Sequence, residues 1–221
     1  MSGIKGINPD EAQVLEELEK LIGKEIPKIN DINPDWNPFL HGVVIENETI
    51  VGLALFNCPL NNLPESIEKL KNIQKLFLKT IKLKDFPKSI FELKSLKSLW
   101  IIETKIKNLP ETIGQLDSLQ QLFLMLGKLE GLPETIGKLI SLNQLSINDN
   151  NLKTLPESIG NLESLGTLHI NSNKLKSIPE SLLNLPKLGF LNAMNNKLDN
   201  KSKEILKKLQ EKGVSVQGIS P

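Results

Sequence analysis

Arginine and tyrosine are both absent from this 221-residue chain. Together with tryptophan, which occurs 2 times, they usually dominate the hot spots of protein interfaces. Any binding surface of this chain must therefore rest on Trp, Phe, Met and aliphatic side chains. Without arginine the chain also lacks the planar fork that holds guanine or phosphate through paired hydrogen bonds, so we expect no nucleic-acid partner.

Cysteine is nearly absent, since Cys58 is the only one, and an internal disulfide is therefore excluded. The start of the chain shows no apolar secretory segment, and the two observations together favour the reducing cytoplasm. No apolar run approaches the ~20 residues that span a bilayer. The net charge of +1 creates no field that would select a membrane surface, so we expect no membrane partner.

What the chain does contain is a fixed period of 23 residues marked by Leu-Pro or a close variant. The prolines that mark it are Pro64, Pro87, Pro110, Pro133, Pro156 and Pro179. A period of this length without insertions is typical of a solenoid. Counted from Ile50 as position 1, the residues at positions 1, 4, 6, 11, 14, 18 and 21 are almost all aliphatic.

This spacing predicts one strand and one short helix in each repeat. Positions 4 and 6 alternate, so a short strand directs both inward. Proline at position 15 suits the first turn of a helix, and positions 18 and 21 then lie on one helical face. A single repeat cannot bury its apolar side, so successive coils are expected to stack.

The clearest copy of the motif, residues 142–164, follows L-x-x-L-x-L-x-x-N-x-L-x-x-L-P-x-x-I-G-x-L-x-x. It resembles leucine-rich repeats of the 23-residue intracellular type, in particular the Ras-group-related repeats of plants and the Ras-suppressor and Shoc proteins of animals. The resemblance implies an α/β fold: a horseshoe-shaped solenoid with a parallel sheet on its concave face, short helices or 3-10 turns on its convex face, and a cap at each end. It also implies a non-enzymatic signalling scaffold or adaptor for another protein, with a small GTPase or its regulator as one candidate partner.

We expect one continuous domain in three parts. Residues 1–49 form an N-terminal cap made of a helix and a hairpin strand, residues 50–196 form seven repeats, and residues 197–221 supply a capping helix and an edge strand. In the first cap, Trp36 and Phe39 are predicted to pack down onto the open end of the solenoid.

Position 9 is the place of an asparagine whose side chain satisfies backbone groups in the turn after the strand. The seven residues there are Cys58, Ile81, Thr104, Gly127, Asn150, Asn173 and Asn196. The asparagine ladder is therefore predicted to be intact only in the C-terminal half. Cys58 is interpreted as a structural substitute.

Strand positions 5, 7 and 8 are predicted to face solvent, yet in the N-terminal half they are apolar. These candidate partner-binding residues are Phe56, Phe77, Trp100, Ile102, Phe123, Met125 and Leu126. A large exposed apolar patch usually marks a contact surface. Several interpretations remain open: a partner protein binds there, two copies of the chain associate through it, the side chains only shield the sheet or pack on a tail of the same chain, or a small apolar ligand binds.

A second candidate surface is a row of lysines at position 10. Its members are Lys82, Lys105, Lys128 and Lys174. Such a basic rim could steer an acidic partner. The alternative is a solvated edge that contributes little.

Catalytic and cofactor signals are sparse. Ser146 and His169 are neighbours in the position-5 column, so a hydrolase based on this pair is a remote alternative. The single histidine and aspartate nearby are too few for a structural zinc site, and there is no glycine-rich phosphate loop. We therefore expect no enzyme activity, no metal and no cofactor.

Overall fold

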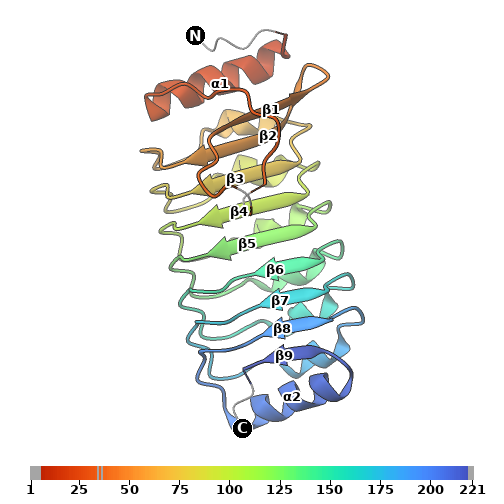
Figure 1. Ribbon diagram of the computed structural model, residues 1–221. Helices are drawn as coiled ribbons and strands as arrows, with labels where there is room; N and C mark the ends of the chain where they lie inside the picture. The colour runs from red at the N-terminus through yellow and green to blue at the C-terminus, as the bar shows by residue number, and fades with distance from the viewer. Residues whose placement is uncertain (1–5, 34, 36, 219–221) are drawn as a thin grey trace.

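The computed structural model describes residues 6–33, 35 and 37–218. Trp36, the expected anchor of the N-terminal cap, lies outside these residues. The described chain forms one continuous stack of coils, with a helix at each end (Figure 1). The stack is the predicted leucine-rich repeat solenoid.

A nine-stranded sheet lines one face of the stack, with its strands in sequence order. The first two strands pair antiparallel and all later pairs are parallel. The strands are β1 (Gly42–Glu46), β2 (Thr49–Phe56), β3 (Lys75–Lys79), β4 (Ser98–Ile102), β5 (Gln121–Met125), β6 (Gln144–Ser146), β7 (Thr167–His169), β8 (Phe190–Asn192) and β9 (Ser215–Gln217).

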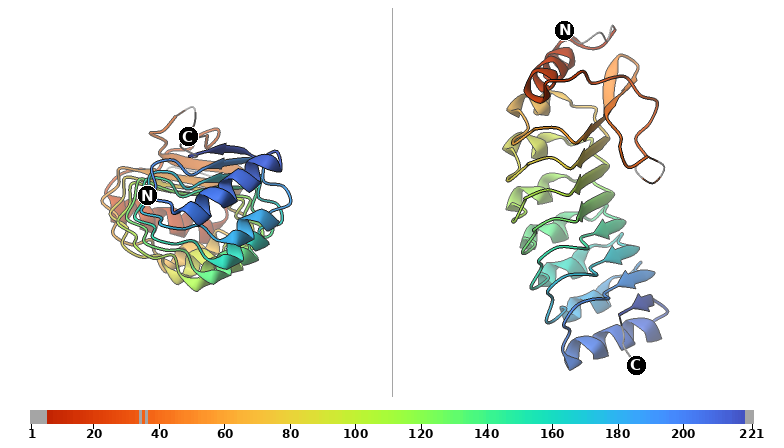
Figure 2. Two further views of the ribbon diagram at one scale, coloured as in Figure 1. Left: turned by 90° about the horizontal axis from the view of Figure 1, so that it is seen from below. Right: turned by 60° about the vertical axis from the view of Figure 1, so that its left-hand side comes forward.

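Six short 3-10 helices lie on the face opposite the sheet (Figure 2). Each follows the proline at position 15, whose backbone is extended and which starts the helical turn. The helices are η1 (Glu65–Lys69), η2 (Lys88–Glu92), η3 (Glu111–Gln115), η4 (Glu134–Lys138), η5 (Glu157–Asn161) and η6 (Glu180–Asn184). The aliphatic positions of the motif are buried between the two layers and form a continuous core.

Two amphipathic α-helices close the ends of the core. Helix α1 (Pro9–Ile22) begins where the Asn8 side chain accepts a hydrogen bond from the backbone N–H of Asp10, and it ends at Gly23 in the left-handed conformation. Asparagine before a helix and glycine after it are common capping signals. Helix α2 (Asn200–Glu211) is capped by Asp199, whose carboxylate accepts a hydrogen bond from the N–H of Ser202.

The asparagine ladder joins neighbouring coils in the C-terminal half, as predicted. In Asn173, Nδ2 donates to the carbonyl oxygens of Ile147 at 2.9 Å and Ile170 at 3.1 Å. Its Oδ1 accepts from the N–H of Leu152 at 3.0 Å. One buried amide therefore satisfies backbone groups of its own coil and of the preceding coil. The same pattern holds at Asn150 and Asn196.

Acidic side chains at position 16 form a second connection between coils. Glu65 accepts a hydrogen bond from the backbone N–H of Ser89 at 3.2 Å, and Glu134 accepts one from Ser158 at the same distance. Each carboxylate therefore caps the 3-10 helix of the next coil. A carboxylate near a helix N-terminus is favoured because it satisfies donors that the helix leaves unpaired.

The 3-10 helices approach one another so closely that position 19 requires glycine in the middle coils. A Cβ atom on Gly137 would lie 2.4 Å from the carbonyl oxygen of Ser158 in the next coil. We expect Gly137→Ala to lower the free energy of unfolding by about 1–3 kcal/mol, since the coils must separate to accept the methyl group. Chemical denaturation followed by circular dichroism would measure this loss.

The matched control is Gly131→Ala, because a Cβ atom there meets nothing within 4 Å. It should leave stability nearly unchanged or raise it slightly. Equal losses at Gly131 and Gly137 would show that contact between the coils is not the cause.

Candidate protein-binding surface

The parallel register of the sheet brings the predicted position-5 side chains side by side. Phe77 pairs with Trp100 and Trp100 with Phe123 in successive strands. The rings of Trp100 and Phe123 are stacked, with centroids 5.5 Å apart and planes at 10°. Phe77 meets Trp100 edge-on at 6.5 Å. The predicted column of aromatic side chains therefore exists.

Three members of the predicted patch are buried, and the expectation that they face solvent is wrong. The exposed fractions of Phe77, Trp100 and Ile102 are 0%, 8% and 7%. The segment between α1 and β1 crosses in front of these strands (Figures 1 and 2), and its Ile32 and Leu40 form a second hydrophobic core with them. These three residues are therefore covered by the same chain, although by an internal segment and not by a tail.

The covering segment fits the first repeat closely because the side chains beneath it are small. A Cβ atom on Gly52 would lie 2.9 Å from Cδ1 of Ile32, and Ala54 beside it is fully buried. Asp31 also forms an ion pair with Lys75, with 2.6 Å between Oδ1 and Nζ. The hydrogen bond from Lys75 lowers the pKa of Asp31 below its usual value.

The remaining members of the predicted patch lie outside this cover. Phe56, Phe123 and Met125 are half-buried, and Leu126 is 51% exposed. Phe39, predicted to pack down, is instead 64% exposed and contacts Phe56 edge-on with ring centroids 5.2 Å apart. We call these five residues the strand-end patch, since most of them lie at or near the carboxyl ends of strands.

An ion pair lies within the strand-end patch. The amino group of Lys79 is 5.7 Å from the ring centroid of Phe39 and 6.0 Å from that of Phe56. The same amino group is 3.7 Å from Oε1 of Glu103. Three strand spacings, roughly 14 Å, separate Phe56 on β2 from Met125 on β5. The patch therefore has two apolar ends with charge between them.

Position 8, in the turn that follows the strand, is left-handed in all seven repeats. The residues are Asn57, Thr80, Glu103, Leu126, Asp149, Ser172 and Asn195, with φ between 49° and 57°. A left-handed backbone costs an ordinary L-residue roughly 1–2 kcal/mol, and Asn or Asp tolerates it best. Leu126 is the one apolar residue of the seven, and half of its side chain is exposed. The left-handed backbone itself does not favour a leucine at this position.

Substitution of Leu126 by asparagine should therefore stabilise the protein. We expect Leu126→Asn to raise the free energy of unfolding by about 1 kcal/mol, since Asn adopts the left-handed conformation more readily. In a chain of this size this corresponds to roughly 2–4 °C in Tm. Calorimetry would measure the change.

Ile140→Asn is the control for this substitution, because Ile140 is 53% exposed and its φ is not positive. Ile140→Asn should not raise the free energy of unfolding. A loss of stability in Leu126→Asn would show that the leucine packs in a way that supports the fold.

The lysines of the predicted basic rim are all exposed. In the described part of the chain, none of Lys82, Lys105, Lys128 and Lys174 takes part in an ion pair. The carboxylates closest in sequence to Lys105 and Lys128 are paired elsewhere, Glu103 with Lys79 and Glu130 with Lys153. The positive charge of the rim is therefore uncompensated by these carboxylates.

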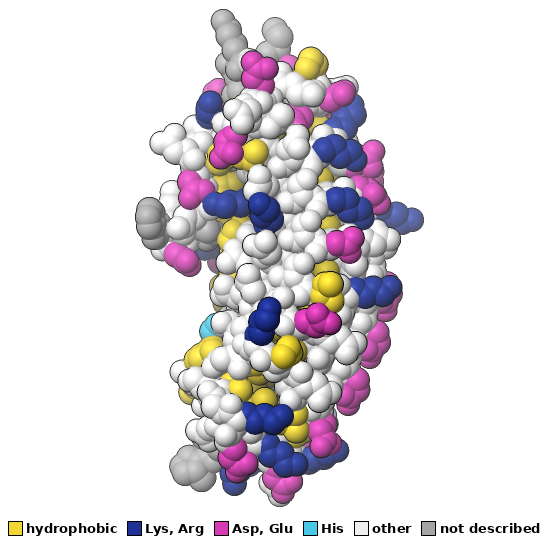
Figure 3. Space-filling model, turned by 90° about the vertical axis from the view of Figure 1, so that its right-hand side faces the viewer, with side chains coloured by type: hydrophobic (Ala, Val, Ile, Leu, Met, Phe, Trp, Pro, Cys, Tyr) yellow, Lys and Arg dark blue, Asp and Glu magenta, His cyan; other side chains and the backbone are white. Residues whose placement is uncertain are grey.

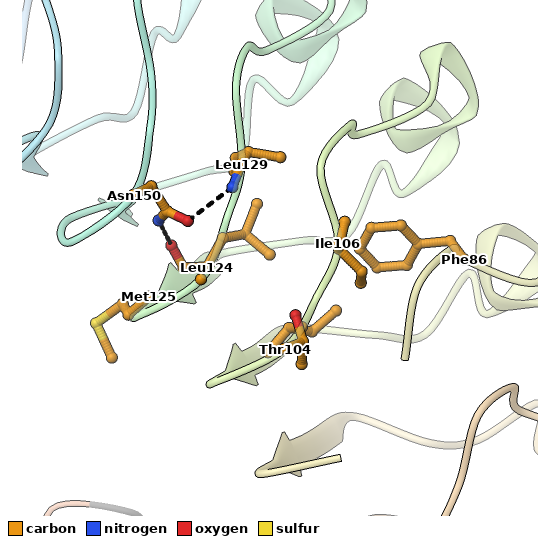
Figure 4. Close-up of a pocket in the computed structure, with 9 residues that line it drawn as sticks. Phe86, Thr104, Ile106, Leu124, Met125, Leu129 and Asn150 are labelled. Carbon is orange, nitrogen blue, oxygen red and sulfur yellow. Dashed lines mark hydrogen bonds between the residues drawn. The ribbon is translucent and has the colours of Figure 1, made fainter. Parts of the chain in front are cut away.

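A small pocket opens behind Met125 where the asparagine ladder is interrupted (Figure 4). Thr104 and Gly127 occupy position 9 there, and Asn150 at its edge donates to the carbonyl oxygen of Leu124 at 2.7 Å. The cavity volume is about 10 Å³, which corresponds to a single water molecule. The pocket is a consequence of the missing asparagines and is too small for an organic ligand.

Ser146 and His169 are adjacent in register, as predicted, without the contact that nucleophilic catalysis uses. Ser146 is only 3% exposed, and no hydrogen bond joins the two side chains among those of the described residues. His169 packs instead on Phe190, with ring centroids 5.2 Å apart, and burial lowers its pKa. The geometry gives the hydrolase alternative no support.

Cys58 is buried beside His41, with 3.8 Å between Sγ and Nδ1. His41 Nε2 lies 3.1 Å from the carbonyl oxygen of Glu25. Because a carbonyl oxygen can only accept, Nε2 carries the hydrogen and donates this bond. Burial raises the pKa of the Cys58 thiol and lowers that of His41. A neutral thiol beside a neutral imidazole agrees with the structural role expected of Cys58.

Over the part of the chain that the structure describes, no three potential metal-ligating side chains form a cluster. The same residues contain no helix long and apolar enough to cross a membrane.

A family model described as a leucine-rich repeat region matches residues 132–216. Among curated proteins, none matches this chain. The agreement of the matched residues with the observed coils supports the fold and leaves the particular subtype open.

Solved structures show the same solenoid. A leucine-rich repeat protein of Leptospira interrogans is 30% identical over 77% of this chain and 49% of that protein, with a TM-score of 0.66. The plant peptide hormone receptor RGFR1, solved in complex with RGF2, is 30% identical over 75% of this chain and 27% of the receptor, with a TM-score of 0.61. The chain thus spans about half of the first protein and about a quarter of the second. A plant ice-binding protein, 23% identical over 88% of this chain and 66% of that protein, shares the fold with a TM-score of 0.68.

The fold places the protein among leucine-rich repeat solenoids. Such repeats generally serve as non-enzymatic scaffolds, since the stacked coils present an extended surface to other proteins.

Proposed function

We propose that this protein is a binding module for another protein and that the strand-end patch is its contact surface. The observation that carries the proposal is Leu126, an exposed leucine held in a left-handed conformation that it disfavours. The fold imposes this conformation on every coil, and a residue poorly suited to the conformation it must adopt is often retained for function. Met125 and Phe123 extend the apolar surface beside it.

The covered part of the sheet has a supporting role in this proposal. Phe77, Trp100 and Ile102 hold the segment between α1 and β1 in place, and this contact keeps Phe39 near Phe56. The partner then meets one end of the patch on β5 and the other on the covering segment. The peptide-bound plant receptor shows that a similar solenoid can hold a chain segment.

The test is affinity capture from an extract of the source organism, followed by quantitative mass spectrometry. Wild-type protein is compared with the double variant Met125→Ser/Leu126→Asn and with Ile140→Asn as an exposed apolar control on another surface. A protein that is captured by wild type and the control but lost from the double variant is the expected result. A small GTPase or its regulator, the partner class that the sequence resemblance suggests, would be recognised directly.

A set of captured proteins that is the same for all three baits would contradict the proposal. Self-association is measured separately, by light scattering over a concentration series. A dimer that the double variant returns to monomer would identify the partner as a second copy of the chain.

A further inference from the structure

We infer that the partner segment which binds the strand-end patch is acidic, with an apolar side chain that contacts Met125 and Leu126 and carboxylates that contact the basic rim. The inference rests on the proposed function and adds the chemistry of the partner. Three features of the structure support it: the alignment of the lysines, the pairing of their neighbours, and the position of Leu126 beside them.

The lysines at position 10 form a column of like charge. The backbone N–H of Lys105 donates to the carbonyl oxygen of Leu83 in the preceding coil, at 3.0 Å. This bond brings position 10 of one coil next to the same part of the coil before it. Lys82, Lys105 and Lys128 therefore follow one another without an intervening residue of opposite charge, an arrangement that is unfavourable within a folded protein.

Two of the carboxylates near this column in sequence are engaged elsewhere, and a third, Asp85, forms no ion pair with Lys82 among the described residues. Glu103 lies two residues before Lys105 but pairs with Lys79, and Glu130 lies two residues after Lys128 but pairs with Lys153. On the opposite edge of the stack, by contrast, basic and acidic side chains are interspersed (Figure 3). The charge of the column is therefore available to a partner.

The apolar anchor and the charge lie at the same place. Leu126 precedes Lys128 by two residues, and both side chains are exposed. In the C-terminal half the lysine recurs at Lys174, but position 8 before it is Ser172. In the last coil the exposed Met194 also precedes a lysine, Lys197, but only two successive coils carry the lysine there. Among the described residues, the N-terminal part of the rim combines three successive lysines with an exposed leucine, so it suits a segment that carries both carboxylates and an apolar side chain.

A protein segment is favoured over a membrane or a nucleic acid by the size and composition of the site. The exposed apolar side chains form two small ends separated by the Lys79–Glu103 pair, whereas a membrane-binding face needs a continuous apolar surface. The chain has no arginine with which to hold phosphate through paired hydrogen bonds.

The experiment is selection of a displayed library of random 12-residue peptides on the full-length protein. The peptides that are enriched are then synthesised with a fluorophore, and their affinities are measured by anisotropy. The targets are wild type, Leu126→Asn, the triple variant Lys82→Gln/Lys105→Gln/Lys128→Gln, and Lys174→Gln as the matched control. Each variant is first checked for an unchanged circular dichroism spectrum.

We expect the enriched peptides to carry Asp or Glu on either side of Leu, Phe or Met. Their affinity should fall at least about tenfold in Leu126→Asn and in the triple variant, stay unchanged in Lys174→Gln, and weaken as salt is added. Peptides that bind the triple variant as tightly as wild type, yet are lost from Leu126→Asn, would overturn the inference and leave the proposed function standing.

If no enriched peptide depends on Leu126, both the inference and the proposed function fail. A parallel measurement uses vesicles of phosphatidylserine and phosphatidylcholine and a 20-nucleotide single-stranded DNA. Binding to either one in the absence of any selected acidic peptide would overturn the inference in favour of an anionic surface.

Discussion

Replacement of Phe77 by alanine should lower the free energy of unfolding by about 3–5 kcal/mol, the usual loss for a large aromatic removed from a packed core. The side chain is fully buried between the sheet and the segment that crosses it. Its removal leaves a cavity beside Trp100, and Ile32 loses its support. Urea denaturation followed by tryptophan fluorescence would measure the loss.

Phe39→Ala is the control for this prediction. Phe39 belongs to the covering segment but is 64% exposed and contacts Phe56 at its edge, so its loss should cost at most about 1 kcal/mol. If Phe77→Ala were as mild as Phe39→Ala, the covering segment would not be packed on the sheet in solution. Phe77, Trp100 and Ile102 would then return to the set of exposed candidate contacts.

Asn173→Ala should lower the free energy of unfolding nearly as much as Phe77→Ala. The asparagine side chain makes four hydrogen bonds with buried or half-buried backbone groups, at 2.9 to 3.2 Å. Each buried group that loses its partner costs about 1–3 kcal/mol, and alanine replaces none of these bonds. A loss of about 3 kcal/mol or more is therefore expected. Because Leu152 loses the acceptor of its N–H, hydrogen exchange at that amide should also become faster.

Asn171→Ala provides the comparison, since Asn171 lies two residues away in the same coil and makes a single long side-chain contact of 3.5 Å with Ser172. The free energy of unfolding of the Asn171→Ala variant should differ from that of wild type by less than about 0.5 kcal/mol. Similar losses for Asn171 and Asn173 would mean that the ladder does not hold neighbouring coils together.

The repeated part of the fold was predictable because its determinants are local. The strand of each coil follows from alternation at positions 4 and 6, and the start of each 3-10 helix follows from the proline at position 15. The intact half of the asparagine ladder was identified by residue type alone, because Asn150, Asn173 and Asn196 are the side chains that can satisfy both donors and acceptors in that turn. Each of these determinants lies within a single coil and recurs from coil to coil.

The candidate site was only partly predictable. The column from Phe77 to Phe123 was correctly identified as a set of neighbours, but the exposure of Phe77, Trp100 and Ile102 was wrong. A signal of the cover was present in β2, where Gly52 and Ala54 are unusually small for strand positions 3 and 5. Small residues in the first coil leave space for another segment of the chain to pack against the sheet.

The sequence by itself determined the coil, the direction of the strands, the residues that share a column and the two helices that close the stack. All of these follow from periodicity and from capping residues within one coil or its immediate neighbour. Only the tertiary structure decided which part of the column faces solvent. That depends on whether Ile32 fits above Gly52 and Phe77, residues 20 to 45 positions away, and such a contact depends on shape complementarity between distant segments, which no repeat pattern records.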